Sequence, residues 1–181
     1  MKKFFKVLVI IILAVVVIMF VFLSYFGAFE KIEIVEKEAG PYNFVYEDHT
    51  GAYIDIGSVF DEMEGRLNED GIEYVASLGI YYDNPTQVAE ENLRSKGGYI
   101  LSDEMYAKVE ALNTYKRMKI EAKKYITIEY PYKHTITMMF APMRVYPKFA
   151  AYLKKKGYRQ EGLALEMYED EKISYMMEII K

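Results

Sequence analysis

The chain has 181 residues, 52% hydrophobic and 28% charged, which excludes a disordered or low-complexity polypeptide and leaves room for one domain plus an appendage. It contains no cysteine, so disulfides, thiolate metal sites and cysteine nucleophiles are excluded. All 27 acidic residues lie at or beyond Glu30, and because an acidic body repels phosphates we expect no nucleic-acid partner.

Residues 7–29 form an uncharged, strongly apolar stretch near the N-terminus. A helix of this length reaches roughly 34 Å at about 1.5 Å per residue, which is enough to cross a hydrocarbon core. A cleaved signal peptide is the alternative, but the run is long for one and the bulky Phe26 stands where a cleavage site needs a small residue. We therefore predict that residues 1–29 are a short stub followed by an uncleaved transmembrane helix.

The charges on either side of this helix predict its orientation. Lys2, Lys3 and Lys6 precede the span, whereas only Lys31 follows it closely, among several glutamates. The positive-inside rule then keeps the N-terminus in the cytoplasm. We expect a single-pass membrane protein whose domain, residues 30–181, is extracytoplasmic.

Beyond the span, the first half of the chain shows strand and helix periodicities in turn. Alternation predicts strands near residues 32–34, 43–49 and 75–82, and a short one at 99–101. A helix is expected from about residue 55 until Gly71 ends it. Ser102 is placed to cap a second helix.

The second half repeats this scheme. Strands are predicted over 125–132 and 134–140, a helix from Pro142 to Gly157, and a terminal hairpin of 163–169 and 173–180. The repeated order indicates an internal duplication with Tyr82 and Tyr168 at matching places. The expected fold is α+β: duplicated strand–helix–strand units form two antiparallel sheet halves with a groove between them, preceded by one transmembrane helix.

The terminal hairpin carries the candidate binding residue. Alternation places Leu165 on the core face and Glu166 and Tyr168 on the face toward the groove. A buried carboxylate is costly unless it is paired, and aromatic faces attract cations, so the two residue types together suit a cationic ligand. Tyr168, Tyr82 and Tyr81 are the expected walls. The alternatives are that these tyrosines belong to the core and that Glu166 only bonds a neighbouring hydroxyl.

Several motifs resemble those of the GyrI-like small-molecule-binding family, which also occurs as the effector-binding domain of multidrug-responsive regulators. The motifs are Gly-Ile-Tyr-Tyr-Asp-Asn-Pro at 79–85 and Leu-Glu-Met-Tyr at 165–168. Gly-Tyr-Ile-Leu-Ser at 98–102 and Arg-Val-Tyr-Pro at 144–147 are similar to its membrane-anchored branch, typified by the testis-expressed ER-phagy receptor of animals. The resemblance implies that Glu166 lies at the bottom of an aromatic pocket for lipophilic cations.

The resemblance leaves other functions open. Some GyrI-like relatives hydrolyse strained toxins, and Glu166 with Tyr168 would supply the acid–base group for that reaction; a raised pKa of Glu166 would favour such chemistry. A membrane-tethered adaptor is a third possibility, although the sequence ends at Lys181, before the acidic tail by which the animal receptor recruits autophagy proteins. His49 and His134 lack carboxylates at ligand spacing, so we expect no metal. We also expect no cofactor and favour a non-catalytic binding domain, while the sequence leaves an enzymatic role open.

Overall fold

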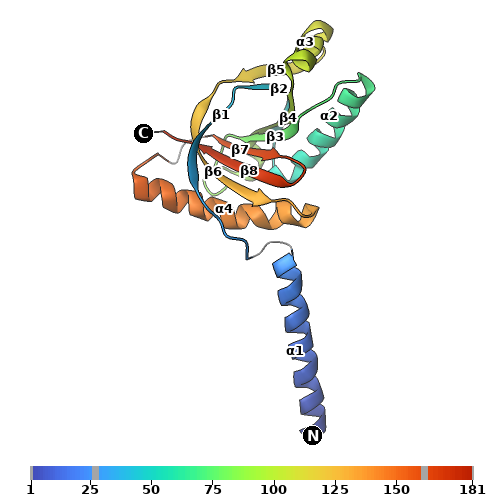
Figure 1. The fold of residues 1–181 in the computed structure, drawn as a ribbon, viewed down its shortest axis with the longest axis vertical. Helices are drawn as coiled ribbons and strands as arrows, with labels where there is room; N and C mark the ends of the chain where they lie inside the picture. The colour runs from blue at the N-terminus through green and yellow to red at the C-terminus, as the bar shows by residue number, and fades with distance from the viewer. Residues whose placement is uncertain (1, 26–28, 160–162, 181) are drawn as a thin grey trace.

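The computed structural model describes residues 2–25, 29–159 and 163–180. Helix α1 (Lys2–Tyr25) points away from the rest of the molecule (Figure 1), and its side chains are almost all exposed. With a mean hydropathy of 3.5 over its most apolar 18 residues, it is the one helix of the described residues that is long and apolar enough to cross a membrane. The rest of the chain forms a separate α+β body.

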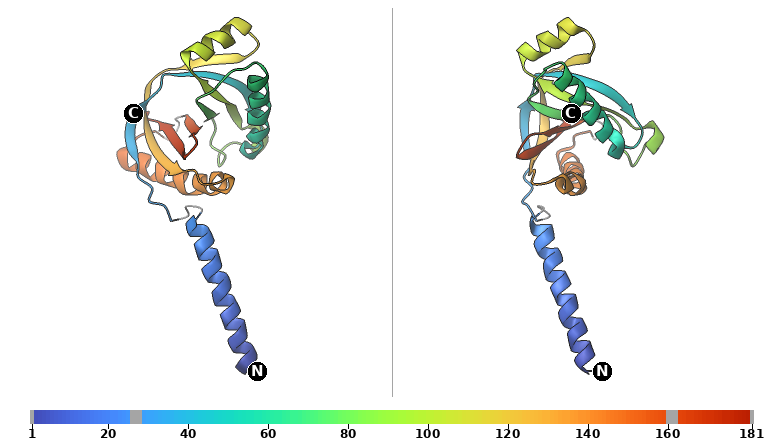
Figure 2. Two further views of the ribbon diagram at one scale, coloured as in Figure 1. Left: turned by 45° about the vertical axis from the view of Figure 1, so that its right-hand side comes forward. Right: turned by 90° about the vertical axis from the view of Figure 1, so that its right-hand side faces the viewer.

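The body is built on one antiparallel sheet of eight strands in the order β1-β6-β8-β7-β3-β4-β2-β5. The sheet curls into a half-barrel (Figures 1 and 2), which confirms the predicted α+β class. Its strands are β1 (Val35–Ala39), β2 (Tyr42–Thr50), β3 (Ala76–Tyr81), β4 (Arg94–Leu101), β5 (Lys116–Ile120), β6 (Lys123–Pro131), β7 (Ala164–Tyr168) and β8 (Lys172–Glu178).

Helices pack on the outside of the curl. The two main ones are α2 (Gly57–Glu69) and α4 (Thr135–Lys156), and a shorter α3 (Asp103–Leu112) lies at the end of the body far from α1 (Figure 1). Short 3-10 turns, η1 (Tyr53–Ile56) and η2 (Glu90–Asn92), complete the body. As predicted, the Ser102 side chain caps α3 by accepting a hydrogen bond from the Met105 N–H.

The two halves of the sheet have the same order of elements. The run β2-α2-β3-β4 corresponds to β6-α4-β7-β8, and β3 and β7 pair at the centre. The halves also exchange edge strands, because β1 pairs with β6 of the second half and β5 pairs with β2 of the first. The halves therefore form one continuous sheet, with α2 over one half and α4 over the other.

Each face of the sheet has its own core. The inside of the curl is filled by residues from strands that are far apart in the sheet, including Phe44, Leu78 and Leu165. On the outer face, which we call the helix face, two clusters form: α4 packs through Val145 and Phe149, and the second cluster brings α2 and α3 together. Between these clusters lie the central strands β3 and β7.

The predicted strand over 134–140 is wrong, because these residues form the first turns of α4. The side chain of His134 caps the helix by accepting the Ile136 N–H at 3.3 Å. Thr137, Ala141 and Val145 are fully buried four residues apart, which is a helical period that the local β-like alternation obscured. Pro142 consequently lies inside α4 and not in its first turn.

Two strands also differ from the predictions. The first strand begins at Val35, and the preceding Ile32 and Ile34 instead pack against the α4 cluster. Strand β5, with the sequence Lys-Arg-Met-Lys-Ile, was not predicted. It is an edge strand, where charged side chains replace the alternation on which strand prediction depends.

Candidate functional site

The candidate site lies on the helix face where the central strands β3 and β7 meet. Gly79 is directly opposite Glu166, and the pairs on either side are Ser77 with Tyr168 and Tyr81 with Ala164. Because side chains two residues apart share a face, Tyr81 and Tyr168 lie on the same face as Glu166. A Cβ on Gly79 would stand 2.9 Å from the Tyr81 ring, so the absence of a side chain there lets Tyr81 lie across the strand.

The carboxylate of Glu166 is held by two tyrosine hydroxyls. Tyr146 of α4 donates to Oε1 and Tyr168 of β7 donates to Oε2, each at 2.5 Å. Glu166 is only 6% exposed, and among the described residues no lysine or arginine pairs with it. The site therefore holds a buried acid that is hydrogen-bonded but has no cationic partner among those residues.

Burial dominates the electrostatics of this cluster. It raises the pKa of Glu166, and the two tyrosine hydroxyls oppose that rise because they stabilise the ionised form. Burial and then the charge of Glu166 raise the pKa of Tyr146 and Tyr168 well above the usual value. The pKa of Tyr81 is raised by the same two causes. Tyr146 and Tyr168 therefore remain neutral donors to the acid, and Tyr81 is a neutral neighbour.

Aromatic rings extend the cluster from α4 to α2. Phe60 of α2 meets the Tyr168 ring edge-on at 6.3 Å, and Tyr53 meets Tyr81 at 4.8 Å. Tyr175 of β8 lies directly opposite Glu166 and is 1% exposed. The Tyr175 hydroxyl has no hydrogen-bond partner within the described part of the chain. The rings thus surround a polar centre that retains an unused hydroxyl.

The structure brings together three of the four predicted site residues, namely Glu166, Tyr168 and Tyr81. Tyr82 lies elsewhere: it packs against the core inside the curl, and Lys96 lies 6.0 Å from its ring. Tyr81 follows Gly79 by two residues, and Tyr168 follows Glu166, the partner of Gly79, by two residues. The residue that corresponds to Tyr168 is therefore Tyr81 and not Tyr82. The predicted match of Tyr82 with Tyr168 is therefore off by one residue.

Sequence reasoning missed Tyr146, Tyr175, Phe60 and Tyr53. One signal was available for Tyr175: the terminal hairpin pairs Tyr168 with Ile173 and so places Tyr175 opposite Glu166, whereas the three-residue turn predicted at 170–172 would have placed Met176 there. Tyr146 had no such signal, since twenty residues and a change of element separate it from the acid.

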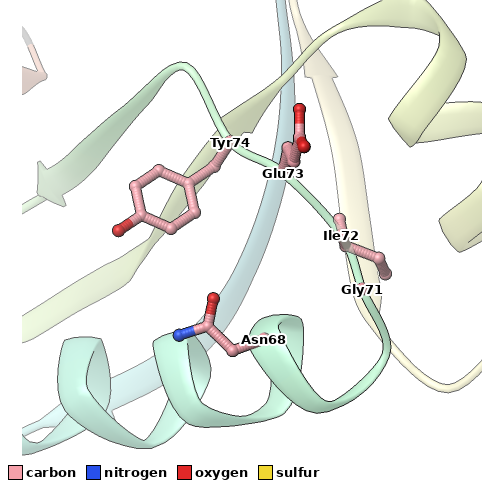
Figure 3. A pocket seen from close by; sticks show the side chains of 5 residues that line it. All are labelled: Asn68, Gly71, Ile72, Glu73 and Tyr74. Carbon is pink, nitrogen blue, oxygen red and sulfur yellow. The ribbon is translucent and has the colours of Figure 1, made fainter.

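Two cavities in the described part of the chain lie away from the carboxylate. One of about 400 Å³ is lined by Asn68, Gly71, Ile72, Glu73 and Tyr74, just beyond the end of α2 (Figure 3). Another of about 410 Å³ is lined by residues of the paired strands β1 and β6 and of the segment before β1. Glu166 is buried, and Tyr146 and Tyr168, which donate to it, are half-buried, as is Tyr81.

The chain belongs to the GyrI-like family, since the profile of the GyrI-like small molecule binding domain matches residues 30–180. It is 30% identical over 138 residues to the testis-expressed protein 264 homolog of Mus musculus. The alignment covers 72% of this chain and 43% of that relative. The chain thus spans less than half the length of this relative.

Solved structures share the fold at low sequence identity. The EcmrR C-terminal domain superposes with a TM-score of 0.63 at 11% identity, over 83% of this chain and 98% of that one. The structure of SAV2435 bound to tetraphenylphosphonium gives a TM-score of 0.53 at 12% identity, over 82% and 94% of the two chains. At these identities the likeness shows the fold alone.

Proposed function

We propose that the protein is a membrane-anchored receptor domain that binds lipophilic cations at Glu166 without catalysis. The observation that carries the proposal is the buried carboxylate, which accepts two tyrosine hydroxyls and pairs with no cation of the described residues. An anion that is desolvated in this way gains strongly from an added positive charge. A water-soluble cation would pay a heavy dehydration cost there, whereas a bulky organic cation would not.

The aromatic surroundings support the same ligand class. Tyr81, Tyr146 and Tyr168 are half-buried beside the acid, and Phe60 extends the rings toward α2. Ring faces attract cations and bury apolar substituents, so one ligand can satisfy both the charge and the walls. The complex of SAV2435 with tetraphenylphosphonium is an instance of such a ligand on this fold.

We further propose that α1 anchors the domain, residues 30–181, as a single-pass membrane protein with its N-terminus in the cytoplasm. The support is the length and hydropathy of α1, together with Lys2, Lys3 and Lys6 before the span. The internal duplication is also an inference, supported by the equal order of elements in the two halves of the sheet.

The experiment compares the wild type with Glu166→Gln, which keeps the shape and removes the charge. Binding of tetraphenylphosphonium to the full chain in nanodiscs is measured by calorimetry, with empty nanodiscs as the blank. A charge-assisted contact is worth about 1.5–3 kcal/mol, so we expect affinity to fall roughly 10- to 150-fold. Triphenylphosphine oxide, a neutral ligand of similar shape, should be affected far less. Equal affinity of both proteins for the cation would remove Glu166 from the site.

One observation favours a second candidate, a hydrolase of strained electrophiles. Burial raises the pKa of Glu166, as suits a general acid–base group, and the Tyr168 hydroxyl lies 2.5 Å from the carboxylate. In this reaction water would bond to a ring carbon, a carbon–carbon bond would break, and Glu166 would pass the proton of water to the released carbon. Ring-opened product from a cyclopropane-bearing electrophile, made by the wild type and not by Glu166→Gln, would favour this candidate over simple binding.

A further inference from the structure

The outward side of α4 is unusual for a helix on the surface of a water-soluble domain. Its inward side packs through Ala141, Val145 and Phe149. The positions on the opposite side of α4, half a turn from these buried residues, are also apolar over most of the helix. Among them, Phe140 is 39% and Met143 is 73% exposed. A surface helix normally presents polar residues there. The outward positions of α4 are Ile136, Phe140, Met143, Pro147, Ala150, Ala151 and Lys154.

The charges of α4 are all of one sign. The sequence Thr135–Lys156 contains no acidic residue, in a chain that has 27 of them. The basic residues of the helix are Arg144, Lys148, Lys154, Lys155 and Lys156. Helix α2, which covers the other half of the sheet, differs in that its exposed residues include Asp61 and Glu62. An apolar stripe beside basic residues is the pattern of a helix that lies in a membrane interface.

The start of the body ties α4 to the end of α1. The backbone oxygen of Glu30 accepts a hydrogen bond from Arg144 at 2.8 Å, and its carboxylate pairs with Lys133 at 2.8 Å. Even a fully extended chain spans only about 17 Å between Tyr25, the last residue of α1, and Glu30. In the views of Figures 1 and 2, α4 is the helix of the body nearest to α1, and it runs across the axis of α1 in Figure 1.

We propose that the outward side of α4 docks on the membrane that α1 crosses, with Phe140 and Met143 in the headgroup–acyl boundary and the basic residues near anionic lipid. The proposal rests on the anchor proposed above. Tyr146, which holds Glu166, belongs to the same helix, so the carboxylate lies within about one helix diameter, roughly 10 Å, of the lipid. Lipophilic cations that accumulate in the bilayer then reach the site directly from it.

The test uses the cysteine-free chain, in which any introduced thiol is the single labelling site. Phe140→Cys and Met143→Cys are labelled with an environment-sensitive fluorophore, in full-length protein reconstituted into vesicles of phosphatidylcholine and phosphatidylserine. Leu112→Cys on α3 is the matched control, because Leu112 is 42% exposed at the opposite end of the body. Brominated acyl chains should quench the labels on α4 about twofold or more and leave the control unchanged.

Each outcome decides the proposal. Quenching of both α4 labels, reduced when phosphatidylserine is omitted or when Lys148, Lys154 and Lys155 are replaced by glutamate, supports docking. Labels on α4 that behave like the control overturn the docking proposal. Protection of these labels from aqueous quenchers without quenching by brominated lipid also overturns it, and would assign this side of α4 to a protein contact. Flotation with the vesicles tests α1 separately: its loss overturns the anchor and the docking together. The response of ligand affinity to Glu166→Gln is independent of both readouts.

Discussion

Replacing Tyr146 with phenylalanine removes one of the two donors to the buried carboxylate. The side chain loses only its hydroxyl oxygen, so its volume is otherwise unchanged. The Tyr146 hydroxyl donates to Oε1 of Glu166 at 2.5 Å, and the only other donor in the described residues is Tyr168. A hydrogen bond to a charged group contributes about 1.5–3 kcal/mol to stability. For a domain of this size, that loss lowers Tm by about 3–12 °C.

The same substitution in a Glu166→Gln background tests whether the charge is responsible. There Tyr146 bonds a neutral amide, which is worth about 0.5–1.5 kcal/mol, so the loss should be smaller by about 1 kcal/mol. Urea unfolding of the full chain in detergent, followed by near-ultraviolet tyrosine circular dichroism, measures all four corners of this cycle. An equal loss in both backgrounds, or no loss at pH 7, would refute the view that Glu166 is a charged acceptor.

The pH dependence gives an independent check with a defined sign. Burial raises the pKa of Glu166 in the folded state above its ordinary value of about 4.5. As pH rises through that value, the unfolded chain releases this proton first and the folded state loses relative stability. The Tyr146 hydroxyl opposes this because it stabilises the ionised form. Tyr146→Phe should therefore be nearly as stable as the wild type in acid, and the difference should grow as pH rises toward neutrality.

Three further outcomes are expected. Deletion of residues 1–29 should leave a body that unfolds in one cooperative thermal transition, whereas a molten product would show that α1 is needed for folding. A reporter that works only in the cytoplasm should be silent when fused after Lys181, and full activity would reverse the proposed orientation. Gly98→Ala should abolish folding or lower the free energy of unfolding by on the order of 4 kcal/mol, because its Cβ would stand 1.9 Å from the Val45 oxygen. The control is Gly65→Ala inside α2, whose Cβ meets nothing within 4 Å and which should stabilise by about 1 kcal/mol in the same denaturant titration.

Local patterns predicted those elements whose periodicity matches their environment. The terminal hairpin alternates between a buried core face and a site face, so its two strands and the side of Glu166 could be read from the sequence. Its register differs from the prediction by one residue, because Glu169 bonds Lys172 across a two-residue turn. The helix α2 was predicted for the same reason, since Met63 and Leu67 recur at a helical spacing and are buried.

The remaining features depend on contacts between distant segments. Whether Tyr81 or Tyr82 joins the site is decided by the register of β3 on β7, and a shift of one residue moves a side chain to the other face. The edge strands β1 and β5 are each paired with the other half of the sheet, which no local pattern indicates. Tyr146 contacts Glu166 only because α4 packs across β6 and β8, and the start of α4 was itself misread as a strand.

The two halves of the sheet share an order of elements but differ at the central pair. At the centre of the sheet, one half contributes Glu166 and the other contributes Gly79 directly opposite. A second acid at that position would place two carboxylates side by side in a buried setting, where mutual repulsion would force one of them to bind a proton. The glycine avoids this and also clears the space that Tyr81 occupies, because a Cβ there would stand 2.9 Å from the Tyr81 ring. One half of the fold therefore supplies the charge, and the other supplies the room for an aromatic wall beside it.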